Sequence, residues 1–290
     1  YFIAPVLNLQ KSSCLRGHKT LHSQPGRGTI QTVIDYLPNG REIGGYLMEE
    51  ILVAAAFYIT CALTVVFTAL QMRKATRLKR VLASIVLFAA GFIAMSCQRN
   101  FIRFGYFILG GLLFSLIGLI LLGARKSRVM RVLGAVMFVG VNILYFFAFK
   151  NNLADEFADS ANNIIFYAAL VAFLDFGGLA FFAGERRFSL KILLLLPNAV
   201  ASAVAASLGI SLGIRYLDAD SYSITLGLLL CVGCVLFAFA NLAVCKSFIK
   251  TERYDLNSKT GAFEKFAVPA YYIGQLLLVA TMLFVRIRRQ

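Results

Sequence analysis

Long apolar segments follow one another along most of this chain, and they limit the folds that are open to it. About eight of them reach the roughly 18 residues that a helix needs to cross a bilayer. Their apolar residues run continuously and do not alternate with polar ones, which excludes the strands of a membrane barrel. A hydrophobic fraction of 59% also excludes an ordinary soluble domain. We therefore predict an all-α fold, a polytopic membrane protein with about eight transmembrane helices in a bundle, whose spans are residues 50–72, 80–97, 101–123, 129–149, 164–183, 189–214, 222–245 and 265–287.

The net charge of +15 is concentrated in alternate loops. Lys and Arg are frequent between spans one and two, three and four, five and six, and seven and eight. The opposite loops are poorer in basic residues and carry the acids Asp155, Glu156, Asp159, Asp218 and Asp220. Because basic loops stay on the cytosolic or matrix side, loops 1–2, 3–4, 5–6 and 7–8 are predicted there, with both termini on the other side. The strong basicity favours the mitochondrial inner membrane.

The basic residues anchor loops and form no clustered stripe with interleaved aromatic side chains. This pattern predicts membrane lipids, rather than nucleic acid, as their partner.

The sequence divides into two regions. Residues 1–49 are a polar, loop-like N-terminal tail, and residues 50–290 form the eight-helix transmembrane domain. The chain begins with Tyr1, which we interpret as a processed chain or a fragment, and a removed presequence would fit import into an organelle. Because such tails are usually poorly ordered unless they are tied down, we expect the tail to contact other subunits of a membrane complex.

Ionisable groups are scarce inside the predicted spans. Asp175 is the one acid that lies well inside a span, and both histidines, His18 and His22, lie in the tail. Membrane enzymes and pumps keep such costly groups at depth for their function, so the scarcity argues against catalysis. Two interpretations of Asp175 remain open: a proton or ion site, or a buried carboxyl that is neutral or paired with Arg103 or Arg131.

Two short motifs indicate helix packing rather than chemistry. Cys231 and Cys234 form a CxxC inside an apolar span, without a histidine nearby. A metal or redox site is the alternative, but we predict that the thiols pack between helices. Gly209 and Gly213 form a GxxxG that permits close approach of a neighbouring helix, and Pro197 is expected to kink the same span. The sequence predicts no cofactor and no metal.

Four segments carry a further signal. The stretch GLLFSLIGL at 111–119 is followed by GAVMFVGVNILYFFAF at 134–149, VLFAFANLAVCKSF at 235–248 and AYYIGQLLLVA at 270–280. In this order they resemble the GLxFSxxGD helix, the following helix, the LFxxSD segment and the final Tyr-Tyr helix of the lysoplasmalogenase-like (YhhN-type) family of eight-span membrane proteins. Members of that family are linked to hydrolysis of the vinyl-ether bond of lysoplasmalogens.

The departures from the family pattern concern its acids. Leu119 stands where the family has an aspartate, Asn241 stands in place of the Ser-Asp aspartate, and Asn142 stands at the histidine position. Vinyl-ether hydrolysis needs a proton donor and a positioned water, and removing one such group typically costs about 10²–10⁴ in rate. The resemblance therefore implies a pseudoenzyme without catalytic residues. It also implies a vestigial lipid pocket, formed by Ser115, Leu119, Asn142, Tyr145, Asn241, Tyr271, Tyr272 and Gln275.

Three functional hypotheses remain open. The first is a non-catalytic protein that serves as an accessory or structural subunit of a larger membrane complex. The second is a lysoplasmalogenase or related lipid hydrolase whose altered site uses Asp175 as its acid. The third is a lipid-binding subunit in which Asn142, Tyr145, Asn241 and Gln275 bond a headgroup, although these side chains could instead bond one another or nearby backbone. A transporter is not favoured, because the chain shows no clear internal repeat.

Overall fold

The computed structural model describes residues 40–73, 77–96, 102–122, 128–153, 160–182, 190–217, 221–251 and 262–284, and all of them are helical. The helices are α3 (Gly40–Arg73), α4 (Arg77–Ser96), α5 (Ile102–Leu122), α6 (Arg128–Leu153), α7 (Ser160–Phe182), α8 (Leu190–Leu217), α9 (Ser221–Thr251) and α10 (Ala262–Phe284). Seven of these helices are long and apolar enough to cross a membrane, whereas the described apolar part of α7, Ile164–Asp175, is shorter. The predicted all-α membrane bundle is confirmed for the described part of the chain.

The chain divides into two units, Tyr1–Glu50 and Ile51–Gln290. Helix α3 begins at Gly40, so the prediction that the last ten residues of the tail are loop-like is wrong. These residues include Leu47, Met48 and Glu49, which favour helix. Residues 1–39 lie outside the described residues, as do most residues of the loops whose sidedness was predicted. The predicted contacts of the tail and the predicted sidedness of the loops therefore stay untested.

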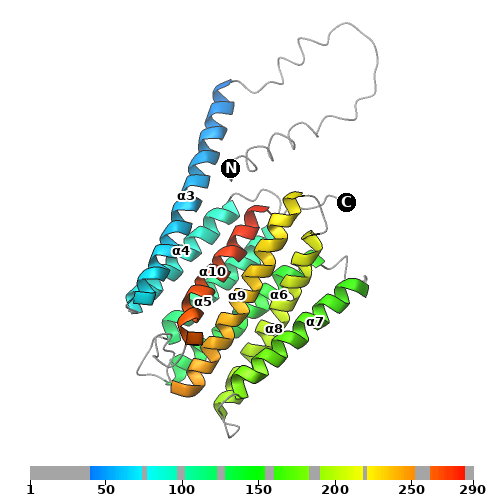
Figure 1. The fold of residues 1–290 in the computed structure, drawn as a ribbon. Helices are drawn as coiled ribbons and strands as arrows, with labels where there is room; N and C mark the ends of the chain where they lie inside the picture. Colours follow the sequence, from blue (N-terminus) through cyan, green and yellow to red (C-terminus); the bar gives the residue numbers. More distant parts are fainter. Residues whose placement is uncertain are drawn as a thin grey trace. The chain divides into compact units, whose positions relative to one another are not determined.

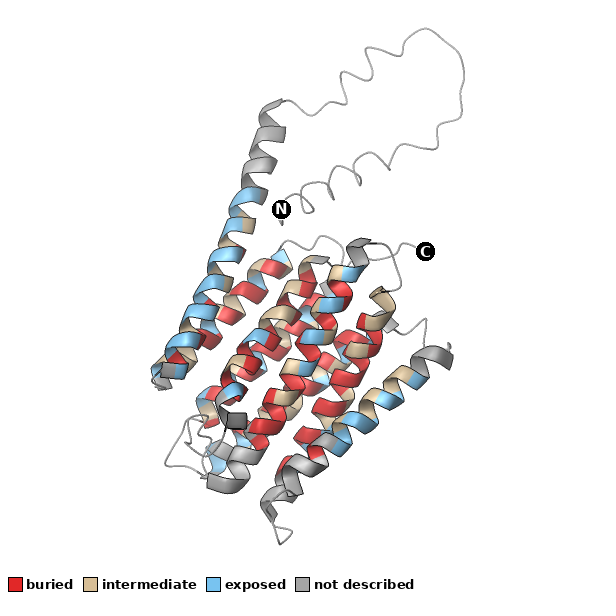
Figure 2. Ribbon diagram, in the orientation of Figure 1, coloured by how far each residue is buried: buried red, intermediate tan, exposed pale blue. Residues whose placement is uncertain are grey.

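A ring of six helices surrounds the core of the larger unit. Contacts run from α4 to α5, then to α6, α8, α9 and α10, and α10 returns to α4 and α5. These helices lie side by side in Figure 1 and share one main cluster of buried apolar residues. Helix α7 lies outside the ring and packs against α8 and α9. In Figure 2 the buried residues run along the ring helices, while the described part of α7 is largely exposed.

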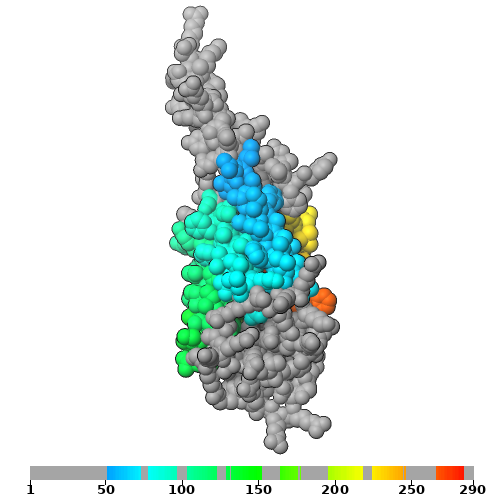
Figure 3. Space-filling view, turned by 90° about the vertical axis from the view of Figure 1, so that its left-hand side faces the viewer, coloured from blue at the N-terminus to red at the C-terminus, as the bar shows by residue number. Residues whose placement is uncertain are grey.

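The part of α3 that belongs to the larger unit packs through one side. Phe57 joins the core cluster, and Thr64, Thr68 and Gln71 are buried. The Thr64 hydroxyl donates to the Thr60 carbonyl oxygen at 2.9 Å and the Thr68 hydroxyl to the Thr64 carbonyl oxygen at 2.7 Å, so the two threonine hydroxyls are satisfied within the helix. Figure 1 and Figure 3 show this part of α3 beside α4.

Helices α8 and α9 approach closely at the two short motifs. A Cβ added at Gly213 would lie 2.6 Å from the Cys231 sulfur and 2.9 Å from the Gly227 carbonyl oxygen, both closer than ordinary contact. At Gly209 an added Cβ would meet the Cys234 sulfur. The glycines therefore make room for the thiols, which are free and pack between the helices as predicted. Helix α8 continues through Pro197.

Candidate functional site

Helix α10 brings together one group of the predicted site residues. The hydroxyl of Tyr145 on α6 donates to Oε1 of Gln275 on α10 at 2.5 Å, and both side chains are fully buried. One turn earlier on α10, the hydroxyl of Tyr271 is hydrogen-bonded to the hydroxyl of Ser115 on α5. This group links α5, α6 and α10 through two hydrogen bonds, each of which joins two helices.

The neighbouring Tyr272 points to a different helix. Its hydroxyl lies 3.2 Å from the Ser84 hydroxyl on α4 and donates to the Arg80 carbonyl oxygen at 3.1 Å. The rings of Tyr271 and Tyr272 meet edge to face with centroids 5.2 Å apart. Consecutive residues on a helix point about 100° apart, which explains how one tyrosine pair reaches both α4 and α5.

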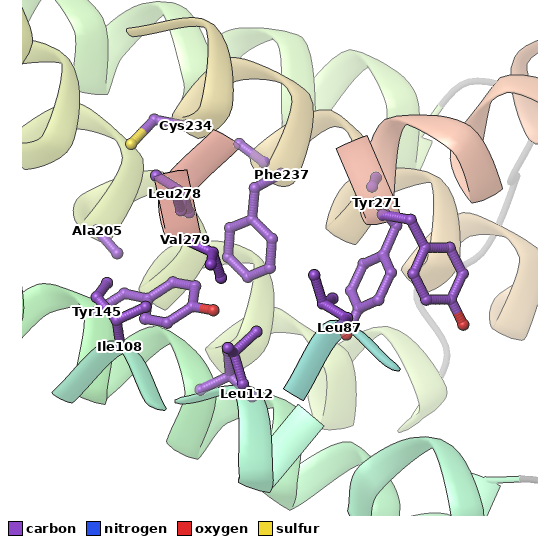
Figure 4. Packing of buried hydrophobic residues seen from close by; sticks show 14 of the residues in the cluster. Leu87, Ile108, Leu112, Tyr145, Ala205, Cys234, Phe237, Tyr271, Leu278 and Val279 are labelled. Atoms are coloured by element: carbon purple, nitrogen blue, oxygen red, sulfur yellow. The ribbon is translucent and has the colours of Figure 1, made fainter. Parts of the chain in front are cut away.

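Aromatic packing closes this group against α9. The ring of Phe237 lies 5.2 Å from that of Tyr145 and 6.2 Å from that of Tyr271, measured between centroids. In Figure 4 Phe237 lies between the two tyrosines, with Leu112 of α5 nearby. Each such aromatic pair stabilises the packing by about 0.5–1.5 kcal/mol beyond its buried area. The packed rings therefore hold the two tyrosine hydroxyl groups in place.

A second polar group lies between α6, α8 and α9. Nδ2 of Asn142 donates to Oδ1 of Asn198 and to the Phe138 carbonyl oxygen, each at 2.9 Å. Nδ2 of Asn198 donates in turn to the Cys245 sulfur at 3.4 Å. The chain of hydrogen bonds therefore crosses three helices.

One turn along α8, Ser202 continues the same group. Its hydroxyl oxygen accepts a hydrogen bond from Nδ2 of Asn241 at 3.2 Å. Asn198 and Ser202 lie four residues apart on α8, as Asn241 and Cys245 do on α9, so two matching faces meet.

The structure thus divides the predicted pocket residues into two groups. Ser115, Tyr145, Tyr271 and Gln275 belong to the first, with Tyr272 beside it, whereas Asn142 and Asn241 belong to the second. Leu119 joins neither group: its side chain is buried in the apolar core cluster.

Sequence reasoning missed the α8 members of the second group, Asn198 and Ser202, and also Ser84. The signal for Asn198 and Ser202 was present, because two polar residues four apart in an otherwise apolar span mark one face of a helix.

Three atoms in these groups lack a hydrogen-bond partner. They are Oδ1 of Asn142, Oδ1 of Asn241 and Nε2 of Gln275, and all three side chains are fully buried. A buried polar atom left unsatisfied costs about 1–3 kcal/mol. The two asparagine oxygens can therefore each accept a further hydrogen bond, and the glutamine nitrogen can donate one.

Asp175 lies in neither group. Its side chain is exposed on α7, so the interpretation of a buried carboxyl is wrong. Two residues along an α-helix turn by about 200°, and Asp175 stands two residues from Phe173 and from Gly177, which face the bundle. Arg103 is exposed on α5, and in the described part of the chain α5 makes no contact with α7. The Arg131 side chain lies outside the described residues.

The assembled groups are hydroxyls, amides and thiols, which bind by hydrogen bonds and are neutral. Among the described residues, no three His, Cys, Asp or Glu side chains lie close enough together to hold a metal ion. The chemistry that the two polar groups support is recognition of a polar group inside the bundle.

In comparison with known proteins, the model of the YhhN family matches residues 80–282, from the first turn of α4 to the last turn of α10. No curated protein and no solved structure matches the chain.

Proposed function

The chain belongs to the YhhN family, and on that premise we propose that it is a non-catalytic, lysoplasmalogenase-like membrane protein. In this proposal it serves as an accessory or structural subunit of a larger membrane complex in the mitochondrial inner membrane. Its residues 1–49 contact other subunits, and its basic loops face the matrix. The family match includes all four segments that carried the resemblance.

One observation carries the proposal. Leu119, at the position where the resemblance implies an aspartate, is 3% exposed and packs in the apolar core cluster. A leucine side chain has no proton to give, and it offers no hydrogen-bonding atom that could position a water.

The second position where an acid is implied supports the same proposal. There the Asn241 amide donates to Ser202 in a hydrogen bond between α9 and α8. An amide is not a useful general acid, so this position contributes to helix association in place of acid–base chemistry.

The subunit proposal is tested by the size of the native particle. Native membranes are solubilised in mild detergent and separated by blue-native electrophoresis, with the chain detected by antibody. We expect it to migrate far above its own 31.9 kDa. Migration of the whole population as a free particle near that mass would refute the subunit role, and recovery outside mitochondrial fractions would refute the location.

The alternative of an altered lipid hydrolase is tested separately. Purified protein is incubated with lysoplasmalogen, and release of free fatty aldehyde is measured. We expect no release above the detergent blank. Release of aldehyde by wild type would contradict our proposal. Release that is lost in Asp175→Ala would identify Asp175 as the acid, and release that persists would show catalysis by other residues.

A second candidate function is lipid-headgroup binding, and the three unsatisfied polar atoms favour it. A headgroup with hydrogen-bond donors would satisfy the asparagine oxygens, and an acceptor such as a phosphate oxygen would satisfy Gln275 Nε2. Native mass spectrometry after mild extraction should then detect a bound lipid that is lost in Gln275→Leu. Ser207→Ala is the matched control, because the Ser207 hydroxyl donates to the Ala203 carbonyl oxygen of its own helix. A wild-type protein free of lipid would contradict this function.

A further inference from the structure

Helix α7 has an inner face and an outer face. Phe166 and Phe173 pack against the core cluster, and Gly177 is buried where an added Cβ would lie 3.3 Å from Leu242 of α9. These residues are spaced by seven and four, which places them on one side of the helix. The inner face therefore attaches α7 to the bundle.

The outer face of α7 carries Asp175, the one acid that lies well inside a predicted span. Ile164 is 70% exposed and Val171 is 56% exposed, and both lie on the same side as the exposed Asp175. Because Asp175 points directly away from the inner face, its carboxyl group cannot reach α8 or α9. Within the described part of this chain, α7 has no other neighbour.

Asp175 also lies well inside its helix, away from both ends. It stands eleven residues after Ile164 and seven before Phe182, or about 16 Å and about 10 Å along the axis. A carboxyl group at such depth is costly against hydrocarbon, and such groups normally pair with an opposite charge or face the interior of a bundle. Lipid is therefore a poor neighbour for this part of α7.

Two small residues share this outer face. Ala168 and Ala172 are exposed and lie four residues apart, three and seven residues before Asp175. Small residues at this spacing allow the backbone of a second helix to approach closely. The face therefore combines a surface for close helix packing with a negative charge.

We propose that the outer face of α7 (residues 164, 168, 171, 172 and 175) docks a transmembrane helix of a different chain. That helix carries a Lys or Arg at the depth of Asp175. The inference rests on the proposed subunit role and deepens it, because it names the docking face and the chemistry of the partner. A second copy of this chain is disfavoured: a twofold contact between α7 helices in one membrane would set Asp175 against its own copy at the same depth.

The first test measures assembly in native membranes that contain only the variant chain. Asp175→Asn removes the charge with almost no change of shape, and Asp175→Arg reverses it. Both are expected to lower the fraction of the chain in the large complex by about ten-fold or more, because a desolvated charge loses its partner. The matched control is Leu174→Ala, whose side chain is 44% exposed one position away, and it should stay within about two-fold of wild type.

This test distinguishes a failure of the subunit role from a failure of the docking face. A wild-type chain that migrates alone refutes the subunit role and the docking face together. A wild-type complex that retains both Asp175 variants at normal levels refutes the docking face and leaves the subunit role intact. Because Asp175 touches no core residue, far-UV circular dichroism of the purified variants should match wild type. A variant that has lost helix overturns the outward placement of this side chain.

The second test identifies the occupant. A photo-crosslinking amino acid is placed at Val171, and the crosslinked peptide is sequenced by mass spectrometry. We expect a transmembrane segment of another chain with a Lys or Arg within about one turn of the crosslink. A crosslink to a second copy of this chain, to lipid alone, or to a segment without a basic residue would overturn the proposal.

Discussion

Replacing Tyr145 with Phe tests the hydrogen bond that joins α6 to α10. The Tyr145 hydroxyl donates to Gln275 Oε1 at 2.5 Å, and both residues are fully buried. A phenylalanine keeps the ring and its packing against Phe237 and Phe149, whose centroids lie 5.2 and 6.3 Å away. The substitution therefore removes one hydroxyl group. It leaves the Gln275 side chain without a partner, because its Nε2 already has none.

The size of the effect follows from that unsatisfied amide. An unsatisfied buried polar group costs about 1–3 kcal/mol, while hydrogen bonds between transmembrane helices contribute about 0.6 kcal/mol on average and about 1.7 at most. We expect Tyr145→Phe to lower the free energy of unfolding by about 1–2 kcal/mol. The double variant Tyr145→Phe, Gln275→Leu removes both partners and should lie within about 0.5 kcal/mol of wild type, because no polar group is left unpaired.

The assay is unfolding by SDS in mixed micelles, followed by far-UV circular dichroism. Wild type, both single variants and the double variant complete a cycle that isolates the interaction between the two side chains. Ser207→Ala serves as the control for loss of a buried hydroxyl that bonds within its own helix. A Tyr145→Phe variant as stable as wild type, with a double variant equal to the sum of the singles, would refute the predicted coupling.

Three further predictions concern packing and sidedness. Gly213→Ala should lower the free energy of unfolding by about 1–3 kcal/mol through overpacking against α9. The control Gly110→Ala should cost little, because its added Cβ would lie 3.4 Å from Leu144, an ordinary contact. Equal losses in the two variants would contradict the close approach of α8 and α9. Leu119→Ala should lower the free energy of unfolding by about 2–5 kcal/mol by opening a core cavity. Leu113→Ala, on the same helix but 41% exposed, should lower it by less than about 1 kcal/mol. The same unfolding assay measures both, and equal losses would contradict the burial of Leu119. Single cysteines in residues 123–127 and 154–159 should react with an impermeant maleimide from opposite sides of the membrane, with the former on the matrix side, and labelling from one side would contradict the alternating topology.

The helices of this protein could be predicted because length and continuous apolarity are enough to specify a membrane span. Their ends were harder, as α9 shows: the predicted span stops at residue 245, but the helix runs to Thr251. A helix need not end where the apolar run ends, since residues such as Lys246 also favour helix. For the same reason α3 begins ten residues before its apolar segment.

The candidate site was predictable as a set of residues and not as a set of contacts. Asn142 and Tyr145 lie one turn apart on α6, yet the first bonds to Asn198 of α8 and the second to Gln275 of α10. Nothing along α6 indicates this division. It depends on which helices flank α6 and at what height their polar residues meet it.

The amino-acid sequence by itself determined the membrane bundle, the kinship and the replacement of the implied acids by Leu119 and Asn241. These are properties of segments and positions, and they do not depend on how the helices meet. Tertiary structure decided which polar side chains pair and that Asp175 faces outward. Helical periodicity sets the angles between side chains on one helix, but only packing against its neighbours sets how that helix is rotated about its axis.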